Sequence, residues 1–331
     1  MKKALLLFLI LLISTLAFAS CSLFDSSEYS SEGLVYKVSD DRTYAEVVNY
    51  TGNAKRVKIE KEYIGLPVKN IYDQSFKNNK TIVSVIIPDS VTSIGNYAFY
   101  DCSLTSVVIG DGVTTIGYSA FSHCSSLTSV VIPDSVTSIG NDAFSDCYAL
   151  TSVVIPDSVT SIGDRAFSFC SALTSVVIGD SVTSIGYSAF WGCSSLSSVV
   201  IGDSVTSIDD SAFRYCGSLK FNEYDNCKYL GSDSNPYFAL IEASNKNMSS
   251  YEIHNDTRII ADYTFHGCSR LTSILIPDSV TSIGYAAFSD CYSLTNVYYT
   301  GTKEEWATIT IASLNSALEN ATIHYNYVPA E

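Results

Sequence analysis

The sequence predicts a solenoid of stacked repeats, mainly β, wound around a parallel sheet. Three observations predict it. Phenylalanine recurs at a nearly fixed spacing of 23 residues, the same apolar pattern accompanies each phenylalanine, and the turn residues between the apolar positions also repeat. The recurring residues are Phe76, Phe99, Phe121, Phe144, Phe167, Phe190, Phe213, Phe265 and Phe288. A period of about 20 to 29 residues with this pattern is typical of solenoids, whose units cannot bury their apolar faces alone.

One repeat shows how each unit is built. The segment Leu-Thr-Ser-Val-Val-Ile at 127–132 is expected to form one strand of a parallel sheet, with alternate residues facing inward. Pro133 and Asp134 then turn the chain, since proline presets a turn dihedral and aspartate accepts turn hydrogen bonds. The segment Val-Thr-Ser-Ile-Gly at 136–140 crosses back as a second short strand, and Phe144 fills the centre of the coil.

The recurring motif x-x-I-G-x-x-A-F-x-x-C, as at 137–147, resembles the BspA-like (Treponema-type) leucine-rich repeats. The resemblance covers residues 57–301 and nine phased repeats. It implies a leucine-rich-repeat solenoid of the α/β horseshoe class, here mainly β. Proteins resembling this family are commonly surface adhesins of host-associated microbes, with matrix proteins such as fibronectin or fibrinogen among their ligands. The resemblance therefore implies an extracellular protein partner, although a fold does not fix its partner.

The chain divides into seven expected segments. Asp209 replaces the repeat glycine just before the array is interrupted, and a Gly-Ser-Asp-Ser-Asn-Pro turn cluster marks a hairpin within the interruption. The segments are a signal peptide (1–20), a Ser-rich acidic tether (21–33), an N-terminal β cap (34–56), leucine-rich repeats (57–216), a β-hairpin insertion (217–249), further repeats (250–301) and a C-terminal cap (302–331).

The N-terminal segment predicts export. Two lysines precede an apolar stretch that is too short to span a bilayer, which is typical of a signal peptide. Residues 18–21 resemble a lipobox, which would make Cys21 the lipidated first residue of a surface lipoprotein anchored to the membrane without spanning it. Ala17-Phe18-Ala19 also fits cleavage for soluble secretion, which stays open as the alternative.

Composition excludes one class of partner. The formal net charge is −15, with 34 acidic against 19 basic residues, so the chain is a poor candidate for binding nucleic acid. With 47% hydrophobic and only 16% charged residues it has enough apolar side chains for a large core.

The repeat also explains the abundance of cysteine and aspartate. Eight of ten cysteines occupy one repeat position, which predicts a ladder of buried, reduced thiols rather than disulfides or a zinc site. The aspartates after Pro or Gly form a second ladder. Each is expected to accept a backbone N–H in its own turn, and the alternative is a file of Ca²⁺ sites. These aspartates are Asp89, Asp111, Asp134, Asp157, Asp180, Asp203 and Asp278.

No catalytic or cofactor-binding motif is present in the sequence. The four histidines occupy unrelated positions, and a repeat supplies the same residues at every turn, whereas an active site needs unlike residues converging at one place. We therefore expect no catalytic residues, no cofactor, no metal and no enzymatic activity.

Two surfaces are candidates for binding a ligand. The first is an outward strip on the expected concave sheet face, rimmed by Thr and Ser; an apolar strip often marks a contact site, although β-branched residues also simply favour strands. Its residues are Ile86, Val108, Val131, Val154, Val177, Val200, Leu275 and Tyr298. The second is an aromatic patch at the positions after I-G and A-F, where the repeats differ from one another. Its residues are Tyr97, Tyr100, Tyr118, Phe169, Tyr187, Trp191, Tyr215 and Tyr285.

Three functions remain open from the sequence. The first is a lipid-anchored cell-surface module that binds a host or microbial macromolecule through the solenoid surface. The second is a carbohydrate or mucin binder that stacks glycans on the aromatic residues. The third is a structural, self-associating surface protein with the solenoid as a spacer.

Overall fold

The computed structural model describes residues 29–209 and 211–329. The predicted signal peptide and the predicted lipidation site Cys21 lie outside the described residues. The described chain is a β-solenoid of about 12 turns, mostly parallel strands with almost no helix, which confirms the predicted fold class. It forms two units: the first runs to Val199 and includes Ser211–Leu219, and the second takes in Val200–Asp210 and continues from Lys220.

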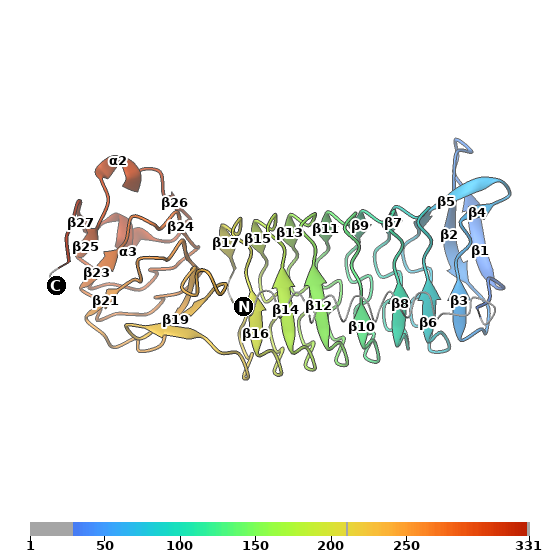
Figure 1. Cartoon of the computed structure of the whole chain (residues 1–331), viewed down its shortest axis with the longest axis horizontal. Helices are drawn as coiled ribbons and strands as arrows, with labels where there is room; N and C mark the ends of the chain where they lie inside the picture. Colours follow the sequence, from blue (N-terminus) through green and yellow to red (C-terminus); the bar gives the residue numbers. More distant parts are fainter. Residues whose placement is uncertain (1–28, 210, 330–331) are drawn as a thin grey trace. The chain divides into compact units, whose positions relative to one another are not determined.

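In the first unit each turn of the coil contributes one strand to each of two faces, and successive turns stack in parallel (Figure 1). The first set of strands is β3 (Arg56–Lys58), β6 (Ser84–Ile86), β8 (Ser106–Val108), β10 (Ser129–Val130), β12 (Ser152–Ile155), β14 (Ser175–Ile178) and β16 (Ser198–Val200). The crossing strands of this unit are β7 (Ser93–Ile94), β9 (Thr115–Ile116), β11 (Ser138–Ile139), β13 (Ser161–Ile162) and β15 (Ser184–Ile185), whereas β17 (Ser207–Ile208) lies among the residues of the second unit. Equivalent residues pair across turns, as Ile139 pairs with Ile162, so a side chain meets its own counterpart in the next repeat.

An antiparallel hairpin lies before the first turn. Strands β1 (Leu34–Val38) and β2 (Ala45–Tyr50) form it, within the expected cap at 34–56. Strand β2 also pairs in parallel with β5 (Leu66–Ile71), which pairs antiparallel with β4 (Glu62–Tyr63). The Tyr50 ring stacks on Phe76 at 5.6 Å, so the hairpin covers the end of the phenylalanine stack.

The centre of the first unit is a continuous stack of phenylalanine rings. Phe121 and Phe144 lie 5.2 Å apart with their ring planes 4° from parallel, and Phe144 repeats this with Phe167 at 5.3 Å. All three side chains are fully buried. Because a buried phenylalanine removes a large apolar area from water, one such ring per turn supplies much of the driving force for coiling.

The glycine that follows each of the strands β7, β9, β11, β13 and β15 marks a close approach between turns. A Cβ built on Gly140 would lie 2.7 Å from the carbonyl carbon of Gly117, and one on Gly163 would lie 2.6 Å from the backbone nitrogen of Asn141. No real Cβ tolerates such distances. The repeat therefore keeps glycine for space, since no left-handed φ is found at either position.

The second unit winds in the same way around its own core. One sheet has the order β18-β19-β20-β22-β24-β26 and the other β21-β23-β25-β27. Their bounds are β18 (Asn222–Tyr224), β19 (Cys227–Leu230), β20 (Ala239–Ala243), β21 (Ser250–Glu252), β22 (Ile259–Ile260), β23 (Ser273–Ile276), β24 (Ser282–Ile283), β25 (Asn296–Tyr299), β26 (Thr310–Ile311) and β27 (Thr322–His324).

The expected insertion at 217–249 differs in one respect from a hairpin that projects from the surface. Strand β19 pairs antiparallel with both β18 and β20, but β20 also pairs in parallel with β22 and so forms part of the coil. Tyr229 and Leu240 are fully buried in the core of the second unit. The insertion is therefore the first turn of this unit, because its apolar residues need the adjacent repeat to cover them.

Two short helices lie near the C-terminus, within the expected cap. Helix α2 (Lys303–Trp306) begins with the predicted capping box: Thr302 Oγ1 accepts from the Glu305 N–H, and the Glu305 carboxylate accepts from the Thr302 N–H at 2.8 Å. Helix α3 (Ser316–Glu319) follows and buries Leu318. The final strand of the described chain is β27.

Candidate functional site

The predicted apolar strip is only partly accessible. Val131 and Val154 are 40% and 37% exposed, whereas Ile86, Val108 and Val177 are half-buried. Val200, Leu275 and Tyr298 are also half-buried. The strip therefore offers little apolar area at each turn.

The threonines beside the strip use their hydroxyl protons within the coil. Thr128 Oγ1 donates to the carbonyl oxygen of Thr105 at 3.1 Å, and Thr151 Oγ1 donates to the carbonyl oxygen of Thr128 at 3.2 Å. A second ladder runs through Thr114 and Thr137 in the same way. Because each hydroxyl already has an internal acceptor, these ladders stiffen the sheet and leave fewer donors for a ligand.

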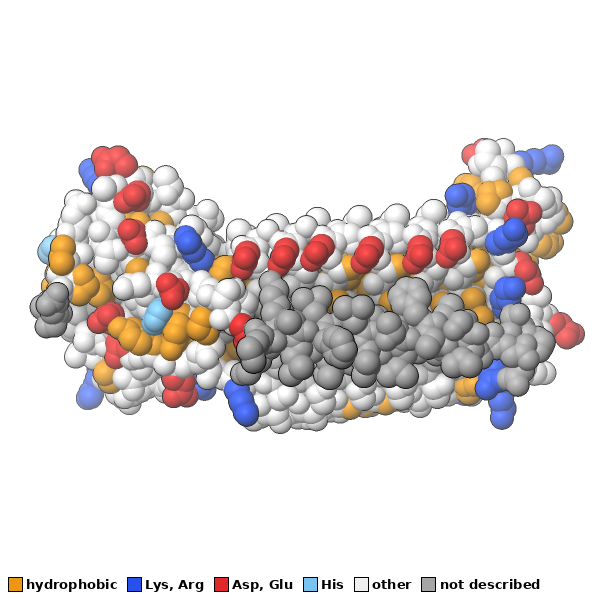
Figure 2. Space-filling view, in the orientation of Figure 1, with side chains coloured by type: hydrophobic (Ala, Val, Ile, Leu, Met, Phe, Trp, Pro, Cys, Tyr) orange, Lys and Arg blue, Asp and Glu red, His pale blue; other side chains and the backbone are white. Residues whose placement is uncertain are grey.

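The predicted aspartate ladder forms a regular acidic row along the first unit (Figure 2). For Asp89 and Asp157, the expectation that the carboxylate caps its own turn is wrong. Asp89 Oδ1 accepts from the Asp111 N–H at 3.0 Å, and Asp157 Oδ1 accepts from the Asp180 N–H at 2.8 Å, so the bonds connect successive turns. The physical reason is the short spacing between turns, which brings the neighbouring turn's N–H within reach. Across 29–209 and 211–329, no three acidic, His or Cys side chains are grouped to hold a metal ion.

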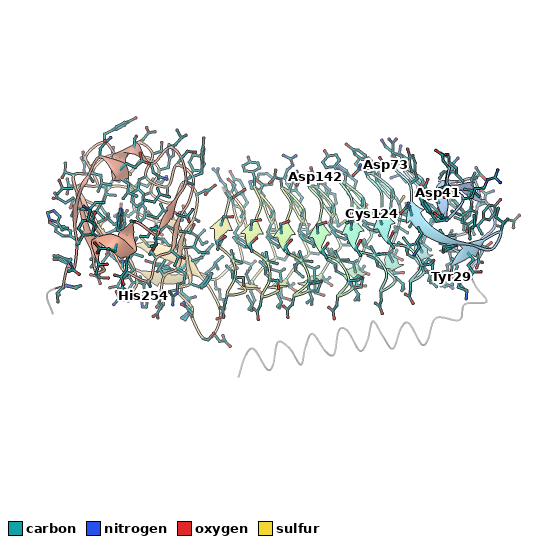
Figure 3. The ribbon with its side chains drawn as sticks, turned by 90° about the horizontal axis from the view of Figure 1, so that it is seen from above. Tyr29, Asp41, Asp73, Cys124, Asp142 and His254 are labelled. Atoms are coloured by element: carbon teal, nitrogen blue, oxygen red, sulfur yellow. The ribbon has the colours of Figure 1, made fainter. Side chains whose placement is uncertain are left out.

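The cysteine ladder lies inside the coil, where Figure 3 labels Cys124. Nine cysteines of the described chain are free and buried. The Cys124 thiol donates to the carbonyl oxygen of Phe99, and that of Cys147 to Phe121, at 3.2 and 3.3 Å. Burial raises the pKa of these thiols, for Cys102 to about 12. They are therefore neutral packing groups and not nucleophiles.

The predicted aromatic patch is not one surface. Seven of its eight residues fall into three clusters, because they occupy different positions in the repeat and are separated by turns with polar residues, such as the one carrying Asp142 and Asp146. The clusters are Tyr97, Tyr100 and Tyr118 in the first unit, Phe169, Trp191 and Tyr215 further along it, and Tyr285 with Tyr263 in the second unit. Tyr187 is 45% exposed on the first unit.

In the first cluster, a lysine side chain of the same chain lies over two of the three tyrosine rings. Tyr97 meets Tyr118 edge-to-face at 5.0 Å and Tyr100 at 5.6 Å. The Lys77 ammonium lies over both Tyr97 and Tyr100, 4.9 and 5.5 Å from the ring centroids. An intramolecular cation on these faces reduces what they offer to a partner.

The second cluster, which we call the aromatic triad, consists of Phe169, Trp191 and Tyr215. Trp191 lies edge-to-face between its neighbours, 4.4 Å from Phe169 and 5.2 Å from Tyr215, with ring planes 82° and 88° apart. Phe169 is 40% and Tyr215 61% exposed. The Arg214 guanidinium lies over the Tyr215 ring, 5.2 Å from its centroid. Three rings in contact, two of them 40% or more exposed, match the aromatic anchors of protein interfaces.

The backbone of the triad is costly. Phe169 and Tyr215 have φ of 58° and 61°, in the left-handed region. The equivalent positions of other repeats also have positive φ but carry residues that tolerate it, namely Asn78, Asp101, His123, Asp146, Gly192, Gly267 and Asp290. A bulky side chain there costs about 1–2 kcal/mol. Among the described repeats, only Phe169 and Tyr215 place a Phe, Tyr or Trp at this position.

Two exposed tyrosines were missed by the sequence analysis. Tyr148 and Tyr292 follow the repeat cysteine and are 45% and 81% exposed. The Tyr148 hydroxyl donates to Asp146 at 2.8 Å, and that of Tyr292 donates to Asp290. The residue after the cysteine also varies between repeats, so extending the comparison by one position finds both.

A family model describes most of this chain. The BspA type leucine rich repeat region matches residues 50–162, 137–234 and 243–327, in six copies. The chain belongs to the BspA-type leucine-rich repeat family. The family resemblance inferred from the I-G-x-x-A-F-x-x-C motif is therefore confirmed.

Solved structures of other BspA-type proteins share the fold. A leucine rich cell surface protein from Faecalibacterium prausnitzii is 30% identical, with a TM-score of 0.57, covering 85% of this chain and 97% of its own. A T. pallidum leucine-rich repeat protein is 31% identical, with a TM-score of 0.54, covering 58% and 90%. One from Bacteroides ovatus is 26% identical, with a TM-score of 0.59, covering 90% and 78%. No curated protein matches the chain.

All three relatives are leucine-rich repeat proteins, and the one from Faecalibacterium prausnitzii is named a cell surface protein. The repeat family is consistent with a protein-binding or adhesion module. Such solenoid families are typically binding modules without enzymatic activity. Over residues 29–209 and 211–329, no helix has the length and apolar character of a membrane span.

Proposed function

We propose that this protein is a lipid-anchored adhesion module that binds an extracellular protein through the aromatic triad. The observation that carries the proposal is the left-handed backbone of Phe169 and Tyr215. Seven equivalent positions use Asn, Asp, His or Gly, so the repeat can form this turn without strain. Strain kept at exposed aromatic residues is the pattern expected where a side chain is needed for contact.

The remainder of the proposal concerns location. The F. prausnitzii relative is named a cell surface protein, and the N-terminal sequence ends its apolar segment at Ala19-Ser20-Cys21. A diacylated Cys21 followed by a Ser-rich tether would hold the coil beside the membrane with its sides accessible. Replacing Cys21 with Ser should abolish labelling by a palmitate analogue in cells and release the protein into the medium. Labelling that persists in that variant would contradict the anchor.

The binding surface is tested with the mature chain, residues 22–331, immobilised and exposed to host extracellular proteins including fibronectin and fibrinogen. Three substitutions, Phe169→Asn, Trp191→Ser and Tyr215→Asn, remove the triad. Other repeats already carry small polar residues at the equivalent positions, namely Asn78, Ser145 and Asp146. We expect the triple variant to lose partner binding by roughly 30-fold or more, since interface anchors contribute about 2 kcal/mol or more each.

The matched control is Tyr292→Ser, which removes a more exposed tyrosine outside the triad. Its binding should equal that of the parent protein. Unchanged binding of the partner by the triple variant would show that the triad is not the binding surface. A glycan array that responds while all proteins stay silent would favour the carbohydrate binder instead, and concentration-dependent oligomers without a ligand would favour the self-associating protein.

A further inference from the structure

A shallow hollow of about 360 Å³ lies on the outer face of the sheet β21-β23-β25-β27, within the second unit. Glu252, Leu275 and Tyr298 are register partners on successive strands, so they lie in one file across this face. Asp225 borders the hollow beside Glu252, and Tyr327 borders it beside Tyr298. The hollow thus has carboxylates at one end, a leucine in the middle and tyrosines at the other end.

The carboxylates are held in place by neutral donors. Glu252 Oε1 accepts a 2.5 Å hydrogen bond from the Tyr224 hydroxyl, and Asp225 Oδ2 accepts from the Glu252 N–H at 2.5 Å. The bond to Glu252 raises the pKa of Tyr224 to about 12, so the phenol remains a donor and the carboxylate an acceptor. Each acid keeps its second oxygen, Glu252 Oε2 and Asp225 Oδ1, for a further donor.

No Lys or Arg is among the residues that line the hollow in the described chain. Two half-buried carboxylates without a cation beside them leave a local excess of negative charge. Since charges in a partly desolvated hollow are screened less than on an open surface, a cationic ligand is favoured there.

The tyrosine end supplies a flat aromatic wall. The Tyr298 ring stacks on His324 at 4.9 Å with planes 19° apart, and Tyr327 packs against it at 4.6 Å. His324 Nε2 lies 2.9 Å from Asn296 Oδ1, which fixes the imidazole behind the tyrosine. A ring held in this way needs no ordering when a ligand stacks on it.

The length of the hollow selects the ligand. Glu252 and Tyr298 are two strand spacings apart, about 9–10 Å, with Leu275 between them. We infer that the hollow binds an arginine side chain of a protein partner. Its planar guanidinium donates to Glu252 and Asp225, its aliphatic stem lies on Leu275, and its main-chain amide stacks near the tyrosines.

This inference rests on the proposed function, which makes the partner a protein, but it concerns a different unit and different residues. The probe is N-acetyl-arginine amide, and the matched neutral probe is N-acetyl-citrulline amide, which has the same shape without the charge. Binding to residues 22–331 is measured by saturation-transfer NMR and by titration at low and at high salt.

We expect the arginine amide to bind at least fivefold more tightly than the citrulline amide, and high salt to weaken it. Glu252→Gln and Asp225→Asn, which keep the acceptors of the internal hydrogen bonds, should each weaken arginine binding fivefold or more. Tyr298→Leu should weaken binding of both amides. Glu242→Gln, an exposed carboxylate already paired with Lys228 at 2.9 Å, is the control and should change nothing.

Equal binding of the two amides, or unchanged binding by Glu252→Gln with native circular dichroism, would overturn the inference. So would binding of methyl glycosides or of Ca²⁺ at the same residues in place of arginine. The triple triad variant should retain arginine binding in full. If the triple triad variant still binds the protein partner and the arginine amide still binds through Glu252, the proposed function is contradicted and the arginine site is supported.

Discussion

The thiol of Cys124 donates a 3.2 Å hydrogen bond to the carbonyl oxygen of Phe99, one turn earlier in the coil. The same bond recurs from Cys147 to Phe121 and from Cys170 to Phe144. The phenylalanine carbonyl also accepts the N–H of the cysteine in its own turn, as Phe121 does from Cys124 at 3.2 Å. The Phe121 carbonyl therefore connects two turns, because it accepts the N–H of Cys124 and the thiol of Cys147. This explains a thiol at this position better than redox chemistry does.

Alkaline pH should destabilise the solenoid through these thiols. Burial raises the pKa of Cys102, Cys216 and Cys291 to about 12, above the ordinary value of 9.0, so the folded chain holds these protons longer than the unfolded chain. Stability is therefore complete below pH 9 and falls as the pH rises toward 12, by up to about 1.4 kcal/mol per pH unit for each thiol.

Urea unfolding midpoints at pH 7.5 and pH 10.5 check this. Exposed tyrosines also ionise in this range, so the matched variant Cys147→Val isolates one thiol and should show a smaller loss between the two pH values. The same loss in parent and variant would contradict a thiol origin.

Replacing Phe144 with Ala should cost about 3–5 kcal/mol of unfolding free energy, because the ring is fully buried between Phe121 and Phe167 and a cavity would remain. Tyr187→Ala, which truncates a side chain that is 45% exposed in the same unit, should cost well under about 1 kcal/mol. Chemical denaturation of both variants tests the difference. Similar losses in both would show that the stacked rings do not form the dominant core.

Gly140→Ala should be strongly destabilising although the substitution adds only one methyl group. Its Cβ would lie 2.7 Å from the carbonyl carbon of Gly117, and backbone atoms cannot move aside without separating the turns. Gly217→Ala is the control, since a Cβ there meets nothing within 4 Å. Thermal unfolding of the two variants tests this prediction. A small decrease in the Tm of Gly140→Ala would mean that the turns can separate at little cost in free energy.

Replacing Asp157 with Asn should affect the stability of the solenoid differently from replacing it with Ala. Its Oδ1 accepts the Asp180 N–H at 2.8 Å, and Asn keeps an acceptor while removing one charge from the acidic row. Asp157→Asn is therefore expected to be neutral or slightly stabilising at low salt, and Asp157→Ala to lose about 0.5–1.5 kcal/mol for the lost bond. Denaturation at 20 mM and 500 mM NaCl separates the two effects. An equal loss in both variants would show that the charge and not the acceptor matters.

Periodicity explains why so much of the fold could be predicted from the sequence. The 23-residue spacing identifies the strand, the turn and the central phenylalanine of every repeat, because equivalent residues must occupy equivalent places in a stack. The partner of Asp89 could not be predicted in this way. Its acceptor oxygen is aimed at Asp111, 22 residues away, and reasoning within one turn finds only the nearer N–H groups.

The candidate sites were predictable only in part. Comparison of repeats finds Trp191 and Tyr215 as exceptions, but not that Phe169 completes a triad with them, since that depends on the angle at which each turn presents its side chains. Glu252 and Tyr298 occupy the same repeat position, but nothing in the sequence around Glu252 predicts that the two residues line one hollow. The contribution of Asp225 comes from the insertion, where no repeat provides a register.

The in-register pairing of identical residues, Ile139 with Ile162 for example, also has an evolutionary consequence. An unequal recombination that adds or removes one whole coil in the first unit would restore every contact with an equivalent one. A chain with one coil more or one coil fewer would therefore still fold, so the length of this unit is free to vary between related sequences.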